Sequence, residues 1–278
     1  MSDQAAKLRQ MTLNNSIPKG PISKKGSKCR IIAVTSGKGG VGKTNFTVNL
    51  ALSLAALRQK VLVVDAGLGM ANVVGVLGCL SPRNIPNFSE GELKIADVVN
   101  EGPRGVKFLA GGSGYFHLAN LNDDRLKHVV SQIALFDNWA DIVLIDTGVG
   151  LSHNVLNYIL AADEVIIITT PDPTAITDTY VMIKAYAGQN GDATLRLVVN
   201  RIFGLAEGQL VADKIINTSH RFLELSINNL GYVYEDRNML KAVKNQTPVV
   251  IKFPDAISSR CIDNIAQRLL YGKRVKKS

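Results

Sequence analysis

A glycine-rich segment, Ser36-Gly37-Lys38-Gly39-Gly40-Val41-Gly42-Lys43-Thr44, constrains this chain more than any other feature. It satisfies the phosphate-loop pattern G-x-x-x-x-G-K-[ST] and carries an additional lysine near its start. An apolar run at 31–35 precedes the segment, and a helical pattern at 45–57 follows it. A loop of this composition between a buried strand and a helix predicts a site for a nucleoside triphosphate.

The residue types of the loop suit phosphate binding. Glycines let backbone N–H groups approach phosphate oxygens without obstruction by a Cβ atom, and the start of a helix adds partial positive charge. We expect Lys43 to reach the β- and γ-phosphates and the Thr44 hydroxyl to bind Mg²⁺. The predicted nucleotide-binding residues of this loop are Gly37, Lys38, Gly39, Gly40, Val41, Gly42, Lys43 and Thr44.

Apolar, strand-like runs alternate with helical patterns along the rest of the chain. These runs are continuously apolar, which is typical of a parallel sheet covered on both faces. The pattern predicts an α/β fold with a doubly wound, mostly parallel sheet flanked by helices, and ligands at the carboxyl ends of its strands. The predicted strands are 31–35, 61–65, 106–110, 142–146, 165–169 and 195–200, with a weaker one at 231–234.

Polar residues end three of these strands. Asp65 and Asp146 each follow an apolar run, and both are candidate ligands for the Mg²⁺ that Thr44 is expected to hold. Each could instead cap the turn that follows its strand. Asn200, which precedes Arg201, could read the edge of adenine through its amide, or could simply be a polar strand end.

The two ends of the chain differ from its centre. Residues 1–28 are predicted to form a separate unit, with a short helix at 2–11 and a flexible linker at 14–28. The phosphate-loop domain is expected at 29–255, followed at 256–278 by an amphipathic helix (257–271) and a basic tail. The pattern of that helix fits either a surface on an anionic membrane or a final helix packed on the sheet.

Composition narrows the classes of partner. The net charge of +9 favours acidic partners such as nucleic acid, anionic lipid or an acidic protein face. Much of the excess positive charge lies at the two chain ends, where its role could instead be solubility alone. Three scattered cysteines without a C-x-x-C pair argue against a disulfide framework, zinc or an iron–sulfur cluster, and favour a reducing cytosol. The polar first thirty residues and short apolar runs predict neither a signal peptide nor a membrane span.

Together these residues resemble the MinD/ParA class of deviant Walker ATPases. Lys38 matches the class's signature lysine, 65–69 its switch I, 146–150 its switch II, and Asn200-Arg201 its adenine-contacting pair. The resemblance implies ATP and Mg²⁺ as ligands and an ATP-dependent homodimer in which Lys38 reaches the partner's phosphates. It implies catalytic roles for Lys38, Lys43 and Asp65, and a metal site made by Thr44, Asp65 and Asp146.

Within this class the chain resembles the FlhG (FleN/YlxH) family of flagellar-number regulators. The matching segments are 3–9, 171–180 and 236–254. The family resemblance implies a cytoplasmic protein that binds reversibly to the inner face of the membrane through its carboxyl-terminal helix. It also implies flagellar switch or C-ring proteins or a transcription activator as partners, and stimulation of the GTPase FlhF through Asp3, Gln4, Leu8 and Arg9.

Switch I departs from the family pattern D-x-D-L-G-x-A-N-V-D at two positions. Gly67 replaces the second aspartate, and Val74 replaces the last. The missing carboxylate at 67 is the one that the family uses to position or activate the attacking water. We therefore expect ATP binding and dimerisation with slow hydrolysis, since such effects contribute roughly two to four powers of ten in rate.

Two other functions stay open from the sequence alone. A ParA-type DNA-partitioning ATPase would use the basic charge, but the amphipathic helix and the 3–9 element argue against nucleic acid as a partner. A non-hydrolysing, nucleotide-dependent scaffold would explain Gly67 directly.

Overall fold

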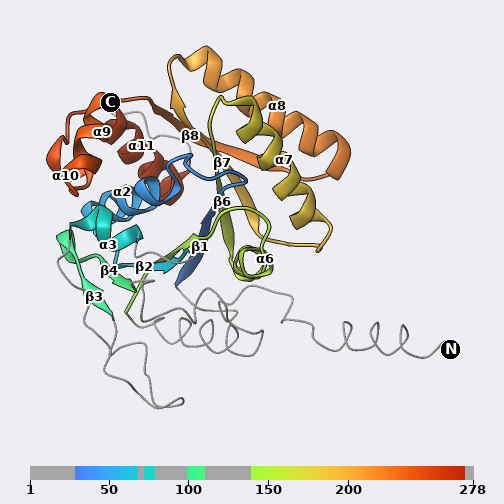
Figure 1. The fold of residues 1–278 in the computed structure, drawn as a ribbon. Helices are drawn as coiled ribbons and strands as arrows, with labels where there is room; N and C mark the ends of the chain where they lie inside the picture. Colours follow the sequence, from blue (N-terminus) through green and yellow to red (C-terminus); the bar gives the residue numbers. More distant parts are fainter. Residues whose placement is uncertain (1–28, 68–71, 79–98, 110–138, 273–278) are drawn as a thin grey trace.

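The computed structural model describes residues 29–67, 72–78, 99–109 and 139–272, and Figure 1 shows their arrangement. The predicted amino-terminal unit at 1–28, including Asp3, Gln4, Leu8 and Arg9, lies outside these residues, as do 68–71 of switch I and the basic tail.

Within the described part of the chain, eight strands form one sheet in the order β3-β4-β2-β5-β1-β6-β7-β8. Every neighbouring pair is parallel except β3 and β4. The predicted doubly wound, mostly parallel α/β fold is therefore confirmed. The strands are β1 (Arg30–Thr35), β2 (Val61–Ala66), β3 (Asn100–Glu101), β4 (Lys107–Leu109), β5 (Ile142–Thr147), β6 (Glu164–Thr169), β7 (Thr194–Ile202) and β8 (Ile227–Tyr234).

Helices cover both faces of the sheet because alternate strand residues point to opposite sides. Ile32 and Val34 of β1 face one core cluster, while Ile31 and Ala33 face the other. The first face packs against α2 (Lys43–Ala56), α3 (Asn72–Leu77), α9 (Arg237–Lys244), α10 (Val249–Lys252) and α11 (Ile257–Tyr271). The second packs against α6 (His153–Ala161), α7 (Pro173–Ala187) and α8 (Leu205–Leu223). A short 3-10 turn, η2 (Pro103–Gly105), precedes β4.

Several boundaries differ from the prediction by one or two residues, and the start of β8 differs by four. Helix α2 begins at Lys43, within the phosphate loop, instead of at residue 45. Strand β8 begins at Ile227, four residues before its predicted start, and its pairing with β7 is irregular near Val198. Exposed Asn228 and Asn229 interrupt the apolar pattern there, because β8 is an edge strand with access to solvent.

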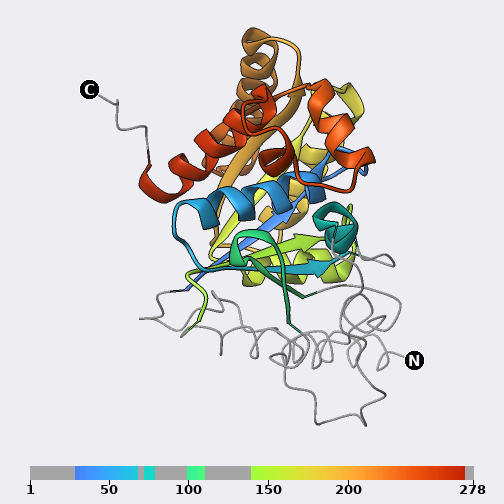
Figure 2. The ribbon, with the colours of Figure 1, turned by 90° about the vertical axis from the view of Figure 1, so that its left-hand side faces the viewer.

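The final helix, α11, has the predicted bounds and packs on the protein core. Ile262, Ile265 and Leu269 are buried in the cluster that includes β8 and α2, and Figure 2 shows α11 lying along α2. Three side-chain hydrogen bonds also hold the helix: Ser53 Oγ to Asp263 Oδ1 (2.6 Å), an Arg30 guanidinium to the Leu269 carbonyl (3.2 Å), and an Arg268 guanidinium to the Leu230 carbonyl (3.2 Å). Of the two alternatives for this helix, the structure shows packing on the sheet.

Contact between a membrane and the apolar face of α11 would require the helix to leave the core. No helix in the described part of the chain combines the length and the apolar composition of a membrane span.

Candidate nucleotide-binding site

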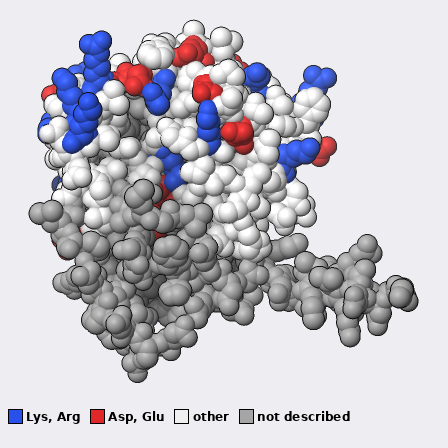
Figure 3. Space-filling view, in the orientation of Figure 1, with Lys and Arg blue, Asp and Glu red and all other residues white. Residues whose placement is uncertain are grey.

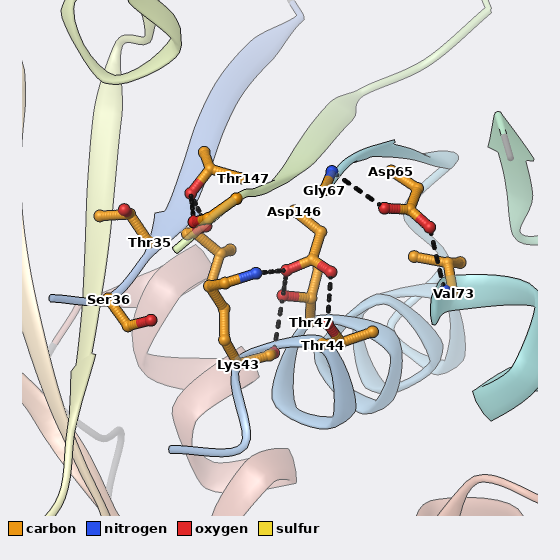
Figure 4. Close-up of polar contacts among 12 residues, drawn as sticks. Thr35, Ser36, Lys43, Thr44, Thr47, Asp65, Gly67, Val73, Asp146 and Thr147 are labelled. Carbon is orange, nitrogen blue, oxygen red and sulfur yellow. Dashed lines mark hydrogen bonds and ion pairs between the residues drawn. The ribbon is translucent and has the colours of Figure 1, made fainter. Parts of the chain in front are cut away.

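A buried polar cluster joins the phosphate loop to the end of β5. Lys43 Nζ lies 2.7 Å from Asp146 Oδ1, and the Thr44 hydroxyl donates to Asp146 Oδ2 at 2.6 Å (Figure 4). Thr47 donates a longer hydrogen bond of 3.4 Å to Asp146 Oδ1. The side chains of Lys43 and Asp146 are only 8% and 1% exposed, so the ion pair is largely removed from water. The first two turns of α2 therefore supply three groups to one carboxylate.

The same cluster has donors that suit Mg²⁺. Thr44 and Asp146 contribute a hydroxyl and a carboxylate oxygen, which are hard ligands of the kind that this cation prefers. Their contact places them close enough to share one ion. Thr44 and Asp146 are therefore the residues that would hold the metal.

Asp65 is the register neighbour of Asp146 on the adjacent strand, but its carboxylate has different partners. It accepts hydrogen bonds from the backbone N–H groups of Gly67 (3.1 Å) and Val73 (3.2 Å), and is turned toward α3 (Figure 4). Burial raises the pKa of Asp65 to about 7, and the nearby Asp146 carboxylate adds to the rise. The structure thus places Asp65 in the turn-capping arrangement that the sequence left open, and a direct role on the metal stays a prediction.

Close packing explains glycine at two positions of the loop. A Cβ atom on Gly37 would lie 2.3 Å from the backbone carbonyl group of Asp178 in α7. Gly42 has φ of +91° and would place a Cβ atom 2.5 Å from the side-chain nitrogen of Asn200. Neither site accommodates a larger residue without displacing its neighbour, so the loop is held against α7 and β7.

A cavity of about 220 Å³ opens beside the phosphate loop. Asn200, at the end of β7, borders the cavity, and its amide nitrogen donates to the Val41 carbonyl at 2.7 Å. In this conformation the amide therefore supports the loop, and its predicted contact with adenine stays a prediction. Arg201 also lines the cavity and pairs with Glu235 at 2.7 Å. The remaining lining residues are Gly40, Gly42, Asn45, Phe46, Val233, Tyr234, Asp236, Met239, Leu240, Val243 and Ile262.

None of the cavity-lining residues from 233 onward was among the predicted site residues. The wall includes Met239, Leu240 and Val243 of α9, a short helix with a polar average composition. The sequence signals for this wall are the amphipathic pattern of α9 and the family resemblance of 236–254.

Lys38 lies apart from the buried cluster, at the outer end of the loop. Its Nζ is 3.1 Å from Asp172 Oδ2 and also contacts the Thr174 hydroxyl. Asp172 caps α7 by accepting from the backbone N–H groups of Thr174 and Ala175. Hydrogen bonds from the Thr174 hydroxyl and from Lys38 lower the pKa of Asp172. Both side chains are well exposed, so Lys38 lies on the rim of the site. Its partner, Asp172, was not among the predicted site residues.

Comparison with known proteins identifies the class. Residues 32–249 match the family described as the CobQ/CobB/MinD/ParA nucleotide binding domain, so the chain belongs to this family. Among solved structures, MinD from Pyrococcus horikoshii complexed with Mg-ADP has a TM-score of 0.70 and 26% identity, over 87% of this chain and 96% of that one. MinD from Pyrococcus furiosus has a TM-score of 0.72 and 27% identity, over 87% and 98%.

Two flagellar proteins narrow the identification. The antiactivator FleN of Pseudomonas aeruginosa is 34% identical over 240 residues, which cover 86% of each chain. The flagellum site-determining protein YlxH of Helicobacter pylori is 33% identical over 273 residues, which cover 97% of this chain and 91% of that protein. The resemblance to the FlhG (FleN/YlxH) family is therefore confirmed.

Proposed function

We propose that this chain is an ATP-dependent switch of the FlhG type, which binds ATP with Mg²⁺, dimerises, hydrolyses ATP slowly and regulates the number or placement of flagella. One observation carries the proposal: Lys43, Thr44 and Asp146 meet in a buried cluster beside a cavity of about 220 Å³. The similarity to FleN and YlxH supports the flagellar role.

Each part of the site has a task in this scheme. Lys43 exchanges its contact with Asp146 for the β- and γ-phosphates, while Thr44 and Asp146 hold the cation. Mg²⁺, when bound, compensates phosphate charge. The cavity bordered by Asn200 takes the nucleoside. Lys38, already at the rim, is free of the inner cluster and reaches the phosphates of a second copy.

The slow hydrolysis follows from Gly67. This residue follows β2 directly and offers Asp65 only its backbone N–H, so position 67 presents no carboxylate to an attacking water. We expect Gly67→Asp to raise steady-state ATP turnover at least roughly tenfold. Turnover is measured with Mg²⁺, and Lys43→Ala in both backgrounds serves as the control that abolishes phosphate contact. An unchanged rate in Gly67→Asp would show that another residue handles the water.

The further partners are also proposals. An FlhF-type GTPase is proposed to be stimulated through Asp3, Gln4, Leu8 and Arg9, and this is tested by its GTP turnover with the full chain and with Gln4→Ala. Flagellar switch or C-ring proteins, or a transcription activator, are proposed as targets of the ATP-bound form. We also propose that the protein associates reversibly with the inner face of an anionic membrane.

Gly67 favours a second function, that of a non-hydrolysing scaffold. Such a protein would bind ATP, remain dimeric and act only through its partners. Single-turnover measurements separate the two, because a scaffold retains intact ATP long after a slow ATPase has converted it.

A further inference from the structure

Helices α9 and α10 present a basic and aliphatic surface at one end of the molecule. Lys and Arg side chains gather at the upper left of Figure 3, where Figure 1 places these two helices. Leu240, Val243 and Ile251 are exposed among them, at 55%, 43% and 36%. We call this the α9–α10 surface, and its exposed residues are Arg237, Leu240, Lys241, Val243, Lys244, Ile251 and Lys252.

The charge on this surface has a single sign. The charged residues of α9 and α10 are all Lys or Arg, and the next acid in the chain is the exposed Asp255. Arg237, Lys241 and Lys244 are spaced i, i+4 and i+7 and so share one face of α9, while Ala242 on the other side is buried. Leu240 and Val243 lie beside the basic face, on the side that borders the nucleotide cavity. The preceding acid, Asp236, is engaged as the cap of α9 and as the acceptor for Ser258, so it does not neutralise that face.

We propose that the α9–α10 surface, and not the apolar face of α11, is the part of this protein that contacts an anionic phospholipid bilayer. This inference rests on the proposed function, in which the protein associates with a membrane. The apolar face of α11 is packed in the core, and hydrogen bonds at Asp263, Arg268 and Leu269 hold the helix there. The α9–α10 surface is exposed without any such rearrangement.

The mixture of side chains favours lipid over nucleic acid. Lysines attract anionic headgroups, and Ile251, which does not line the nucleotide cavity, enters the boundary between headgroups and acyl chains. Ile257, at the start of α11, extends the exposed aliphatic set with 49% exposure. The exposed residues of α9 and α10 include no aromatic side chain on which a base could stack. Because α9 also lines the nucleotide cavity, the proposed bilayer contact lies directly beside the bound nucleotide.

Vesicle binding by the full chain tests the proposal. The double variant Lys241→Glu with Lys244→Glu reverses charge on the surface without touching a residue that lines the cavity. The matched control, Lys184→Glu with Lys214→Glu, makes the same charge change on exposed positions of α7 and α8, across the sheet. We expect the first pair to weaken binding to phosphatidylglycerol-containing vesicles at least roughly tenfold and the control to change it less than about threefold.

The outcomes separate the alternatives. An equal loss of vesicle binding in both double variants, or no loss in the first, overturns the proposal. Tighter retention on duplex DNA than on vesicles, with the same dependence on Lys241 and Lys244, also overturns it. Ile251→Gln should weaken vesicle binding at high salt, where the aliphatic contribution remains; unchanged binding there overturns the aliphatic part. Fluorescent ATP is titrated on the same samples. Vesicle binding that depends on Lys241 and Lys244 in a chain without ATP affinity supports the surface and contradicts the proposed function.

Discussion

The inner and outer ends of the phosphate loop each carry a lysine–aspartate pair, in opposite surroundings. At the inner end, Lys43 and Asp146 are 2.7 Å apart and almost fully buried. At the outer end, Lys38 and Asp172 are 3.1 Å apart, with 37% and 48% of their side chains exposed. Removing one partner of a buried ion pair strongly destabilises the fold, because the other charge stays buried and unpaired. An exposed pair contributes little to stability, because water and salt screen its attraction. We infer that the inner pair maintains the site and that the outer pair is easily exchanged for another partner.

The largest expected effect comes from breaking the inner pair. Asp146→Asn removes the charge that Lys43 faces and the carboxylate that Thr44 contacts. We expect the affinity for ATP with Mg²⁺ to fall by two orders of magnitude or more, and the free energy of unfolding to fall by roughly 3 kcal/mol, because a buried lysine is left unpaired. Fluorescent-nucleotide titration and urea unfolding measure the two. Full stability in this variant would contradict the view that the pair is a structural element.

Asp65 sharpens the comparison, since it is buried beside Asp146 but has no lysine of its own in contact. Its pKa of about 7 lies above the usual 3.8, so the folded state keeps its proton where the unfolded state has lost it. Stability is therefore present at low pH and is lost as pH rises toward 7. We expect the chain to lose about 2 to 3 kcal/mol from this group between about pH 5 and 8, relative to Asp65→Asn. Urea unfolding without nucleotide or Mg²⁺ at both pH values measures it; parallel pH profiles would contradict the shift.

The phosphate loop and the sheet were predictable because their physical causes are local. A glycine pattern between apolar strand and helix specifies phosphate contacts, and continuous apolar runs indicate strands covered on both faces. The structure brings Lys43, Thr44 and Asp146 together, while their predicted contacts with phosphate and Mg²⁺ stay predictions.

The parts that were not predictable depend on contacts between distant segments. Asp65 is bound by the N–H of Val73, eight residues onward, and Lys38 by an aspartate at position 172. Helix α9 has an amphipathic pattern, but that pattern does not indicate that Met239, Leu240 and Val243 line a cavity. The membrane interpretation of α11 was one of two that its amphipathic pattern allowed, and only the packing against α2 and β8 distinguishes them.

Two glycines at the outer end of the loop should respond differently to the same change. Gly37→Ala would place its Cβ atom 2.3 Å from backbone of Asp178, whereas the nearest atom to a Cβ on Gly39 is 3.8 Å away. Backbone cannot yield as a flexible side chain does, so we expect Gly37→Ala to cost about 1 to 2 kcal/mol of unfolding free energy. Gly39→Ala should change it by less than about 0.5 kcal/mol. Equal stabilities in urea would show that α7 can shift away from the loop.

The smallest expected effect is that of breaking the outer pair. Asp172→Asn removes the charge that Lys38 faces, but the amide oxygen can still cap α7 by accepting from Thr174 and Ala175. Since both side chains are exposed, we expect the melting temperature to change by less than about 1 °C, at both about 0.01 M and 1 M salt. Thermal unfolding of Asp172→Asn and Asp146→Asn under the same conditions compares the two ion pairs directly. A salt-dependent loss as large as that of Asp146→Asn would mean that Lys38 is anchored in the single chain. The free energy needed to release Lys38 from Asp172 would then oppose dimerisation, and Lys38 would not be free to contact a second copy.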